Sequence, residues 1–387
     1  MRKIATLAAV LGLALTSAAK AADPVRIGYS LPLTGVFAAA APSQKNAYEM
    51  WRDQVNANGG LNVNGTKRPV ELVMFDDQSD PSQAVKIYEK LITQDKVDLL
   101  LAPWGTLHHV AIAPVLERYK FPMVGDTAAS VTLRQMKPGY IWFPTSAWPD
   151  EMGKQLPLML KEQGIKTVSL TTIQYPFSLE VKKYFLEGLK ANGIEVVSES
   201  DYPADIRDMT AMISSVKQAN PDAELSLSMP GDSVLYTKQA HELGLKPKMQ
   251  FMLVGPGVAF FQKMFGDQLN GLVTMGHWSP SQKKWPEAKP FYDAYVAKYN
   301  EPPDYLDTVL SYMACQILEQ AVGKVGLDKE KLRQTIASDT FQTIDGPVKF
   351  EGVVNVSTPT MFLQYQNGVF EIVWPKSEAT AQLIGPK

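Results

Sequence analysis

The stretch Leu99–Ser130 decides the fold. It begins Leu-Leu-Leu-Ala-Pro-Trp-Gly-Thr-Leu-His-His and ends Phe-Pro-Met-Val-Gly-Asp-Thr-Ala-Ala-Ser. The apolar runs Leu99–Ala102 and Phe121–Val124 are typical of parallel strands that are buried on both faces. A turn containing glycine follows each run, and the apolar residues of Leu107–Tyr119 recur at helical spacing. The pattern predicts strand, turn, helix, strand and turn, with the two strands ending side by side.

The two turns of this stretch predict a binding site. Each leads into the N-terminus of a helix, and the turns carry the hydroxyl residues Thr106 and Thr127. Free N–H groups and the helix dipole at such a position favour an anion. The carboxyl ends of parallel strands are also where open α/β sheets bind ligands. Because no catalytic group accompanies the turns, we predict a site for a small carboxylate.

The composition excludes several classes of protein. The chain has 387 residues, 45% of them apolar, which is enough for two domains with substantial cores. Its formal net charge of −2 and pI of about 6.2 give no basic surface for nucleic acid. With Cys315 as its single cysteine, the chain can form neither an internal disulfide nor a site that needs two cysteines.

The N-terminus reads as a signal peptide over residues 1–21. Met1–Lys3 is basic, Ile4–Leu15 is apolar, and Ala19–Ala21 provides small residues for cleavage after Ala21. No cysteine follows directly, so we expect no lipid anchor. No later stretch has the roughly 20 apolar residues that a membrane span requires. We expect an exported protein, located in the periplasm.

The rest of the chain alternates strands and helices. This order predicts right-handed βαβ units and parallel sheets, and the half from Ile165 repeats the architecture of the half from Val25. Tyr140–Thr145 and Trp278–Pro280 read as crossings between the two halves. We therefore predict an α/β protein with two Rossmann-like parallel-sheet lobes and a multi-strand hinge. The N-terminal lobe comprises residues 22–143 and 277–350, and the C-terminal lobe comprises 144–276 and 351–387.

Catalytic and nucleotide-binding motifs are missing. The sequence has no Walker loop, no Gly-x-Ser-x-Gly and no His-Glu-x-x-His, and Gly255–Gly257 lacks the third glycine of a dinucleotide fingerprint. His108 and His109 are adjacent, so they do not share a helix face as a metal pair would. One of them can help to hold an acid, or both are solvated residues of a first helical turn. We expect no enzyme activity, metal or cofactor.

Several segments together carry a resemblance to a known family. They are Ile27–Gly35, Asn56–Gly60, Phe75–Pro81, the turns Trp104–Thr106 and Thr127–Ala129, and Gln239–Leu245. In this order the chain resembles the type I periplasmic solute-binding proteins of ABC importers, in the leucine/isoleucine/valine-binding group. The likeness covers essentially the whole mature chain. It implies two lobes that close on a small molecule, an inner-membrane ABC permease as partner and, as we expect, a monomer.

The resemblance also implies which residues hold the ligand. In the family, a hydroxyl residue and N–H groups of the first turn bind the ligand carboxylate, and Thr106 matches that hydroxyl. At the second turn a small residue and a hydroxyl residue take part, and Thr127 and Ala129 match this pair with the hydroxyl moved to the earlier position. Tyr175 matches the aromatic residue that covers the ligand from the second domain.

Two departures from the family concern the ligand. Gly257 stands where the amino-acid binders carry an acidic residue that neutralises the ligand's ammonium group, and an unpaired buried ammonium is costly. Asp126 or Asp232 could replace that acid. In addition, the run Ala38–Ala41 replaces a bulky aromatic residue, which enlarges the pocket.

Aromatic residues on predicted loops favour a flat or aromatic ligand, although each one alone fits ordinary packing. They are Phe37, Trp104, Trp148, Phe177 and Trp278. We predict a binding protein for a small organic acid. Its predicted ligand-binding residues are Thr106, Thr127, Ala129, Tyr175, Trp104, Gly105, Phe37, Gly257, Trp278 and His108. The alternatives are a binder of a branched-chain or other amino acid or amide, and a ligand-sensing ectodomain.

Overall fold

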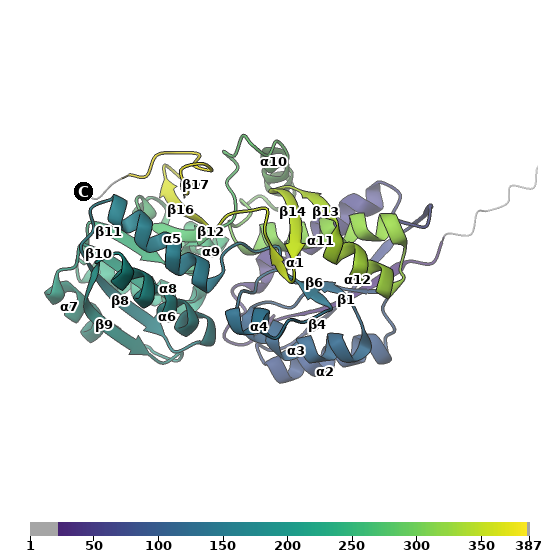
Figure 1. Ribbon diagram of the computed structural model, residues 1–387, viewed down its shortest axis with the longest axis horizontal. Helices are drawn as coiled ribbons and strands as arrows, with labels where there is room; N and C mark the ends of the chain where they lie inside the picture. Colours follow the sequence, from purple (N-terminus) through teal and green to yellow (C-terminus); the bar gives the residue numbers. More distant parts are fainter. Residues whose placement is uncertain (1–21, 385–387) are drawn as a thin grey trace, which may run out of the picture.

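The computed structural model describes residues 22–384, so the predicted signal peptide lies outside the described residues. Two α/β lobes lie side by side (Figure 1), and segments from both halves of the sequence build each of them. None of the helices in residues 22–384 combines the length and the hydropathy needed to span a bilayer.

The N-terminal lobe is built around β1 (Val25–Leu31), whose residues are almost all buried. β1 lies between two parallel neighbours, β4 (Val70–Asp76) and β5 (Leu99–Leu100). A second parallel pair, β6 (Met123–Val124) and β7 (Ile141–Trp142), continues the lobe. Large apolar residues alternate along β1 with Arg26, Gly28 and Ser30, and only Arg26 is not fully buried, so the strand is covered on both faces.

Helices and a small antiparallel sheet complete this lobe (Figure 1). The helices are α1 (Ala41–Ala57), α2 (Pro81–Thr93), α3 (Thr106–Tyr119), α4 (Val131–Gln135), α10 (Ala288–Tyr299), α11 (Asp307–Val325) and α12 (Lys329–Ser338). The small sheet contains β13 (Thr340–Thr343), β14 (Gly346–Glu351) and β15 (Val354–Asn355). α2 begins at Pro81 because the carboxylate of Asp80 accepts a hydrogen bond from the Ser82 N–H at 2.8 Å.

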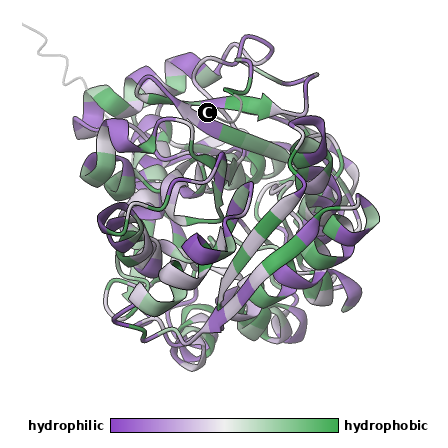
Figure 2. Cartoon of the chain, turned by 90° about the vertical axis from the view of Figure 1, so that its left-hand side faces the viewer, coloured by the Kyte–Doolittle hydropathy of each residue, from purple (hydrophilic) through white to green (hydrophobic). Residues whose placement is uncertain are grey.

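The C-terminal lobe contains a single seven-stranded sheet with the order β17-β16-β12-β11-β10-β8-β9. Its strands are β8 (Thr167–Ile173), β9 (Glu195–Tyr202), β10 (Ala223–Leu227), β11 (Met249–Met252), β12 (Val273–Gly276), β16 (Met361–Gln366) and β17 (Val369–Trp374). Its helices are α5 (Pro149–Glu162), α6 (Pro176–Ala191), α7 (Thr210–Ala219), α8 (Pro230–Glu242) and α9 (Ala259–Phe265). In Figure 2 the helices alternate between hydrophobic and hydrophilic residues, as expected when one face packs on a sheet.

The chain passes between the lobes after β7, after β12 and after β15. Hydrogen bonds join these segments: the Asn355 side chain donates to the Pro144 carbonyl at 2.9 Å, and Thr360 Oγ1 donates to the Ser146 carbonyl at 2.5 Å. Because β15 pairs with β14, residues up to Asn355 accompany the N-terminal lobe, beyond the predicted change at 350/351. The lobe boundaries themselves stay a prediction.

The predicted α/β fold with two lobes and parallel sheets is confirmed. The strands predicted to end side by side are β5 and β6. They pair with β1 and β7 in the sheets, and the turns that follow them meet as predicted, since the Gly105 N–H donates to Thr127 Oγ1 at 2.8 Å. One detail differs. The hairpin of β2 (Leu61–Val63) and β3 (Thr66–Arg68) was not expected, because three-residue strands are too short to show periodicity.

Candidate functional site

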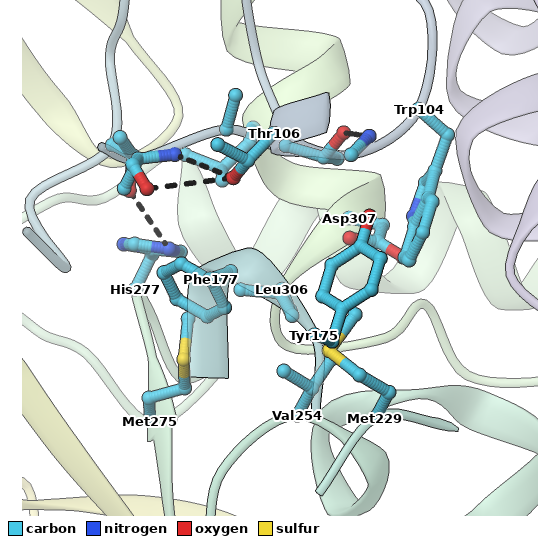
Figure 3. A pocket seen from close by; sticks show the side chains of 16 residues that line it. Trp104, Thr106, Tyr175, Phe177, Met229, Val254, Met275, His277, Leu306 and Asp307 are labelled. Carbon is cyan, nitrogen blue, oxygen red and sulfur yellow. Dashed lines mark hydrogen bonds between the residues drawn. The ribbon is translucent and has the colours of Figure 1, made fainter. Parts of the chain in front are cut away.

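A pocket with an empty volume of about 440 Å³ lies between the lobes (Figure 3). From the N-terminal lobe it is lined by Trp104, Gly105, Thr106, Thr127, Ala128, Ala129, Leu306, Asp307 and Leu310. From the C-terminal lobe it is lined by Tyr175, Phe177, Met229, Val254 and Met275, and from the crossing segments by Thr145 and His277. The turns of Leu99–Ser130 therefore lie at the pocket, at the ends of β5 and β6.

Helix N-termini from both lobes converge on this pocket. The residues that cap α3, α6, α8 and α11 all line it, and they are Gly105, Tyr175, Met229 and Leu306. These helices have 14, 16, 13 and 19 residues, so each carries a full macrodipole with its positive end at the pocket. No lysine or arginine is among the lining residues of the described chain. The positive potential in the pocket therefore comes from the backbone.

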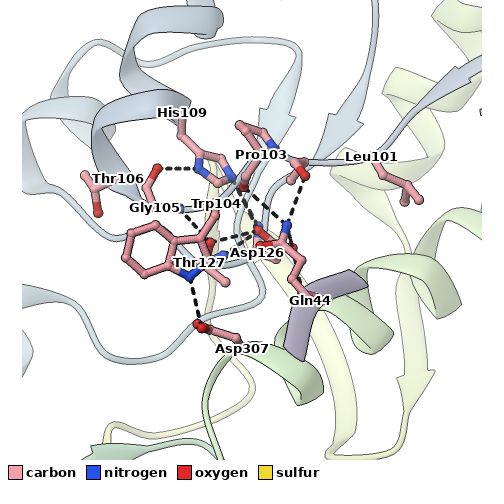
Figure 4. Close-up of polar contacts among 12 residues, drawn as sticks. Gln44, Leu101, Pro103, Trp104, Gly105, Thr106, His109, Asp126, Thr127 and Asp307 are labelled. Atoms are coloured by element: carbon pink, nitrogen blue, oxygen red, sulfur yellow. Dashed lines mark hydrogen bonds and ion pairs between the residues drawn. The ribbon is translucent and has the colours of Figure 1, made fainter. Parts of the chain in front are cut away.

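The two turns bind to each other (Figure 4). The Gly105 N–H donates to Thr127 Oγ1 at 2.8 Å, and the Ala129 N–H donates to Thr106 Oγ1 at 3.2 Å. The prediction that these amides are free is therefore wrong, because the hydroxyl of each turn reaches the backbone of the other. Within residues 22–384, the N–H groups of Thr106 and Ala128 make no hydrogen bond. The Thr106 hydroxyl itself donates to the Ala129 carbonyl at 3.4 Å, a long bond that it must give up to donate to a ligand, so the two amides remain as the free donors for an anion.

Asp126 stabilises the second turn through hydrogen bonds. Its carboxylate accepts hydrogen bonds from Gln44 Nε2 at 2.8 Å, Tyr48 Oη at 2.7 Å and Ser311 Oγ at 2.8 Å, and from the Thr127 N–H at 2.6 Å (Figure 4). Complete burial raises the pKa of Asp126 to about 6, although these hydrogen bonds act in the opposite direction. With its oxygens already bound, Asp126 is not available to a ligand.

Asp232, the other acid considered for a ligand ammonium, is also bound within the protein. It caps α8 by accepting from the Met229 N–H at 3.0 Å, and it accepts from Tyr202 Oη at 2.6 Å. Burial raises its pKa to about 6. Neither Asp126 nor Asp232 is among the residues that line the pocket.

The carboxyl that does line the pocket is Asp307, the first residue of α11. Trp104 Nε1 donates to Asp307 Oδ2 at 2.9 Å (Figures 3 and 4). Burial, and then the nearby carboxyl of Asp304, raise the pKa of Asp307 well above its ordinary value. The sequence analysis did not find this residue, because an acid in the first turn of a helix is common for reasons of the dipole alone.

Aromatic rings close the pocket from both lobes. The Tyr175 ring lies 5.4 Å from that of Phe37, which in turn lies 5.0 Å from Trp104. Only 7% of Tyr175 is exposed, so the two lobes are closed on each other. Its hydroxyl is buried with no hydrogen-bond partner in the described chain, and burial raises its pKa. Tyr175 therefore offers a free donor and acceptor beside the pocket.

Gly105, the residue before α3, has a backbone conformation that favours glycine. Its φ of +83° lies in the left-handed region, which side-chain-bearing residues rarely adopt. A Cβ at this position would point to within 4.0 Å of the Tyr175 hydroxyl.

His277 is a lining residue that the sequence did not reveal. It follows β12 at a crossing, with Nε2 3.5 Å from Thr145 Oγ1 and Nδ1 3.4 Å from Ser146 Oγ. Complete burial lowers the pKa of His277 to about 3, so its ring is neutral. It provides hydrogen-bonding nitrogen atoms but no positive charge. Nothing in the sequence near His277 predicts which residues from other parts of the chain lie beside it.

Four predicted site residues do not line the pocket. Phe37 lies behind Trp104 and Tyr175, and Gly257 lies beneath Leu306, with its Cβ position 3.4 Å from that residue's Cβ. Trp278 is in the core, where its indole donates to the Asp304 carbonyl at 3.2 Å. His108 is completely buried, with Nε2 3.5 Å from an Asp77 oxygen, so it is not a solvated residue either.

Of the other aromatic residues predicted to line the cleft, Phe177 does so, whereas Trp148 packs against Phe143 in the core. In the part of the chain that the structure describes, no three His, Cys, Asp or Glu side chains are grouped so as to hold a metal ion.

The sequence model of the periplasmic binding protein family matches residues 24–368. The chain belongs to this family. Its members are solute-binding proteins of ABC transporters rather than enzymes, so the resemblance drawn from the sequence motifs is confirmed. A curated relative, Leu/Ile/Val-binding protein homolog 7 of Brucella suis, is 25% identical, and the match covers 96% of this chain and 97% of the relative.

Two solved structures of periplasmic binding proteins show the same fold. One is the branched-chain amino acid binding protein LivJ of Streptococcus pneumoniae in complex with isoleucine, with a TM-score of 0.80, 22% identity and coverage of 91% of this chain and 100% of that one. The other is a solute-binding protein of R. palustris in complex with benzoate, with a TM-score of 0.80, 20% identity and coverage of 94% and 98%. Proteins of this fold thus hold both an amino acid and an aromatic acid.

Proposed function

We propose that this chain is the substrate-binding protein of an ABC importer that captures a small carboxylate, aromatic or another organic acid, between its two lobes. The observation that carries the proposal is the convergence of four helix N-termini on one pocket, with no lysine or arginine among the residues of 22–384 that line it. Positive helix ends stabilise an anion and oppose a cation.

The composition of the pocket supports a ligand with a flat apolar body. Apolar side chains line the pocket beside the polar turns (Figure 3). They are the rings of Trp104, Tyr175 and Phe177 and the thioethers of Met229 and Met275. Aromatic side chains stack on rings, and methionine adapts to their edges. The benzoate complex of the R. palustris protein is consistent with such a ligand in this fold.

In this proposal the ligand drives closure. Its carboxylate binds first to the Thr106 and Ala128 amides and the Thr106 hydroxyl, on the N-terminal lobe. The C-terminal lobe then closes and brings Tyr175 and Phe177 onto the ring. Because these contacts exist only in the closed form, the ligand binds that form more tightly and shifts the equilibrium toward it. A monomer in the periplasm would then deliver the ligand to an inner-membrane permease.

An amino acid is the second candidate, and Asp307 is the observation that favours it. A carboxyl in the pocket can pair with a ligand's ammonium group, in place of the acid that is missing at Gly257.

Thermal unfolding in the presence of matched ligands tests the proposal. Benzoate, 3-phenylpropionate and 4-methylpentanoate are compared with phenylalanine and leucine, which add an ammonium group to the last two acids. Binding adds about 2.7 kcal/mol of stability when the ligand concentration is roughly 100 times Kd. We expect the acids to raise Tm and the amino acids to leave it unchanged. Stabilisation by leucine or phenylalanine, with no response to any of the acids, would contradict the proposal.

A further inference from the structure

Asp307 is a carboxyl in the pocket with almost no partner. It is completely buried, and one of its oxygens accepts a single hydrogen bond, from Trp104 Nε1 at 2.9 Å. Its position contrasts with that of Asp126, whose carboxylate accepts several short hydrogen bonds from backbone and side chains. An ionised carboxylate needs such donors when it is removed from water. Asp307 lacks them.

The ionisable groups that face Asp307 add no positive charge. Asp304 lies three residues before it and is completely buried. One of its oxygens accepts from the Leu306 and Thr308 N–H groups at 3.2 and 2.7 Å, and the other has no hydrogen-bond partner within the described part of the chain. Asp126, on the turn after β6, is a further buried carboxyl that acts on Asp307. On the other side of the pocket, His277 and Tyr175 are neutral. An ionised Asp307 would therefore stand near two like groups with no cation beside it.

We propose that Asp307 keeps its proton in the loaded pocket and donates it in a hydrogen bond to the ligand's carboxylate, and so selects organic acids that carry no ammonium group. This inference rests on the proposed function and identifies Asp307 as the residue that selects ligands by their charge. The pocket then holds one negative charge, which belongs to the ligand and is shared along an O–H···O bond. Such bonds between a carboxylic acid and a carboxylate are short and strong.

The same arrangement disfavours an amino acid. An ammonium group beside Asp307 would lie at the N-terminus of α11, where the positive end of a 19-residue helix repels it. Three further helix N-termini face the same pocket. A carboxylate at this place gains from the helix ends and from the Asp307 proton together.

The proposal predicts a pH dependence with a definite sign. A ligand carboxylate is ionised at neutral pH, whereas Asp307 must be protonated for binding. As the pH rises above the pKa of Asp307 in the free protein, affinity falls by up to about tenfold per pH unit, because binding then takes up a proton. Since Asp304 raises the pKa of Asp307, the conservative change Asp304→Asn shifts this fall in affinity to lower pH.

Calorimetric titration of the full mature chain with benzoate tests the inference, from about pH 5.5 up to about pH 10, so that the range extends above the pKa of a carboxyl group that a ligand can reach. The wild-type protein should lose affinity toward high pH, and buffers of different ionisation enthalpy should report uptake of a proton. Asp307→Asn can still accept from Trp104 and donate an N–H to the ligand, but it does not titrate. We expect this variant to bind benzoate within about threefold of the wild type at low pH, with no loss toward high pH.

Two results would overturn the inference, and the first does not depend on whether a variant folds, because proton uptake is measured on the wild type. Benzoate binding without pH dependence or proton uptake would show that Asp307 does not supply a proton, while leaving the proposed function intact. Binding of phenylalanine by the wild type, lost in Asp307→Asn, would identify Asp307 as the partner of an ammonium group. If no organic acid binds the wild type at any pH, the proposed function itself falls, and this inference with it.

Discussion

The two lobes contribute different chemistry to the pocket. The N-terminal lobe provides the polar wall: the turn amides, the Thr106 hydroxyl and the Asp307 carboxyl. The C-terminal lobe provides mostly apolar side chains, among them Phe177, Met229 and Met275. Helix N-termini of both lobes face the pocket, but in the proposed function the side chains and turn amides that contact the ligand's charge belong to the N-terminal lobe, and those that contact its apolar body belong mostly to the C-terminal lobe. Only a ligand that satisfies both walls then stabilises the closed form.

Two buried carboxyl groups, one in each lobe, also differ in the hydrogen bonds that they accept. Asp126 in the N-terminal lobe accepts short hydrogen bonds, of 2.6 to 2.8 Å, from Gln44, Tyr48, Ser311 and Thr127. Glu224 in the C-terminal lobe accepts longer ones, at 3.2 Å from Thr171 and 3.3 Å from Gln250. The first carboxyl supports the binding turn, whereas the second lies within a sheet. Substitutions at these two positions should therefore have opposite effects on stability.

The largest effect is expected for Asp126→Ala. The substitution leaves the side chains of Gln44, Tyr48 and Ser311 buried without their acceptor and releases the turn at Thr127. We expect the free energy of unfolding to fall by about 3–5 kcal/mol, measured by denaturant titration. Asp80→Ala removes an exposed helix cap and is the control, with an expected loss of about 1 kcal/mol. Equal losses in the two variants would contradict the assigned role of Asp126.

Glu224→Gln should raise the free energy of unfolding at high pH, whereas Asp126→Ala lowers it. Burial raises the pKa of Glu224 to about 7 from an ordinary value of 4.5, so the folded state favours the protonated form. Its contribution to stability is complete below about pH 4.5 and is lost as the pH rises through about 7. Above that pH, Glu224→Gln should be more stable than the wild type by up to about 3 kcal/mol, and the two should be similar near pH 5. A variant that is less stable at both pH values would show that Glu224 is needed in its ionised form.

On the polar wall of the pocket, Thr106→Ala should weaken ligand binding by about 1–2 kcal/mol through loss of a hydrogen bond to the carboxylate. Thr106→Ser keeps the hydroxyl and is the matched control. Calorimetric titration with benzoate measures both. If Thr106→Ala binds benzoate as tightly as Thr106→Ser, this hydroxyl does not contact the ligand.

The smallest effect is expected for Tyr175, whose ring lines the pocket from the C-terminal lobe. Tyr175→Phe keeps the ring and removes the hydroxyl that has no partner within the described protein. We expect a loss of about 0.5–1.5 kcal/mol in binding for ligands that reach this hydroxyl, and no change in the preference between acids and amino acids. If Tyr175→Phe changed the preference between acids and amino acids, a side chain of the C-terminal lobe would also contact the charged groups of the ligand. The assignment of charge contacts to the N-terminal lobe would then be wrong.

The sequence predicted the fold well because parallel strands and amphipathic helices leave periodic signals, as β1 and α3 show. It also placed the turns at Thr106 and Thr127 at the pocket, since the carboxyl ends of strands are where such sheets bind ligands. The contacts between the turns could not be predicted, because they join residues that are 22 and 23 positions apart through side-chain geometry.

Single residues far apart in the sequence gave the least signal. His277 reaches the pocket from a crossing between the lobes and Asp307 from the start of α11, and nothing near them in the sequence distinguishes them from residues of an ordinary strand end or helix start. The prediction that Trp278 lines the pocket is wrong because its position next to a crossing does not fix the direction of its side chain. The ring points into the core and stacks on Tyr305, with the ring centroids 5.8 Å apart.

The most direct test of the central claim is a crystal structure of this protein with bound benzoate. The account predicts the carboxylate of benzoate within hydrogen-bond distance of the Thr106 and Ala128 amides and of Asp307, with its ring against Tyr175 and Phe177. A carboxylate that lies away from the helix N-termini, or a benzoate bound outside the space between the lobes, would contradict it.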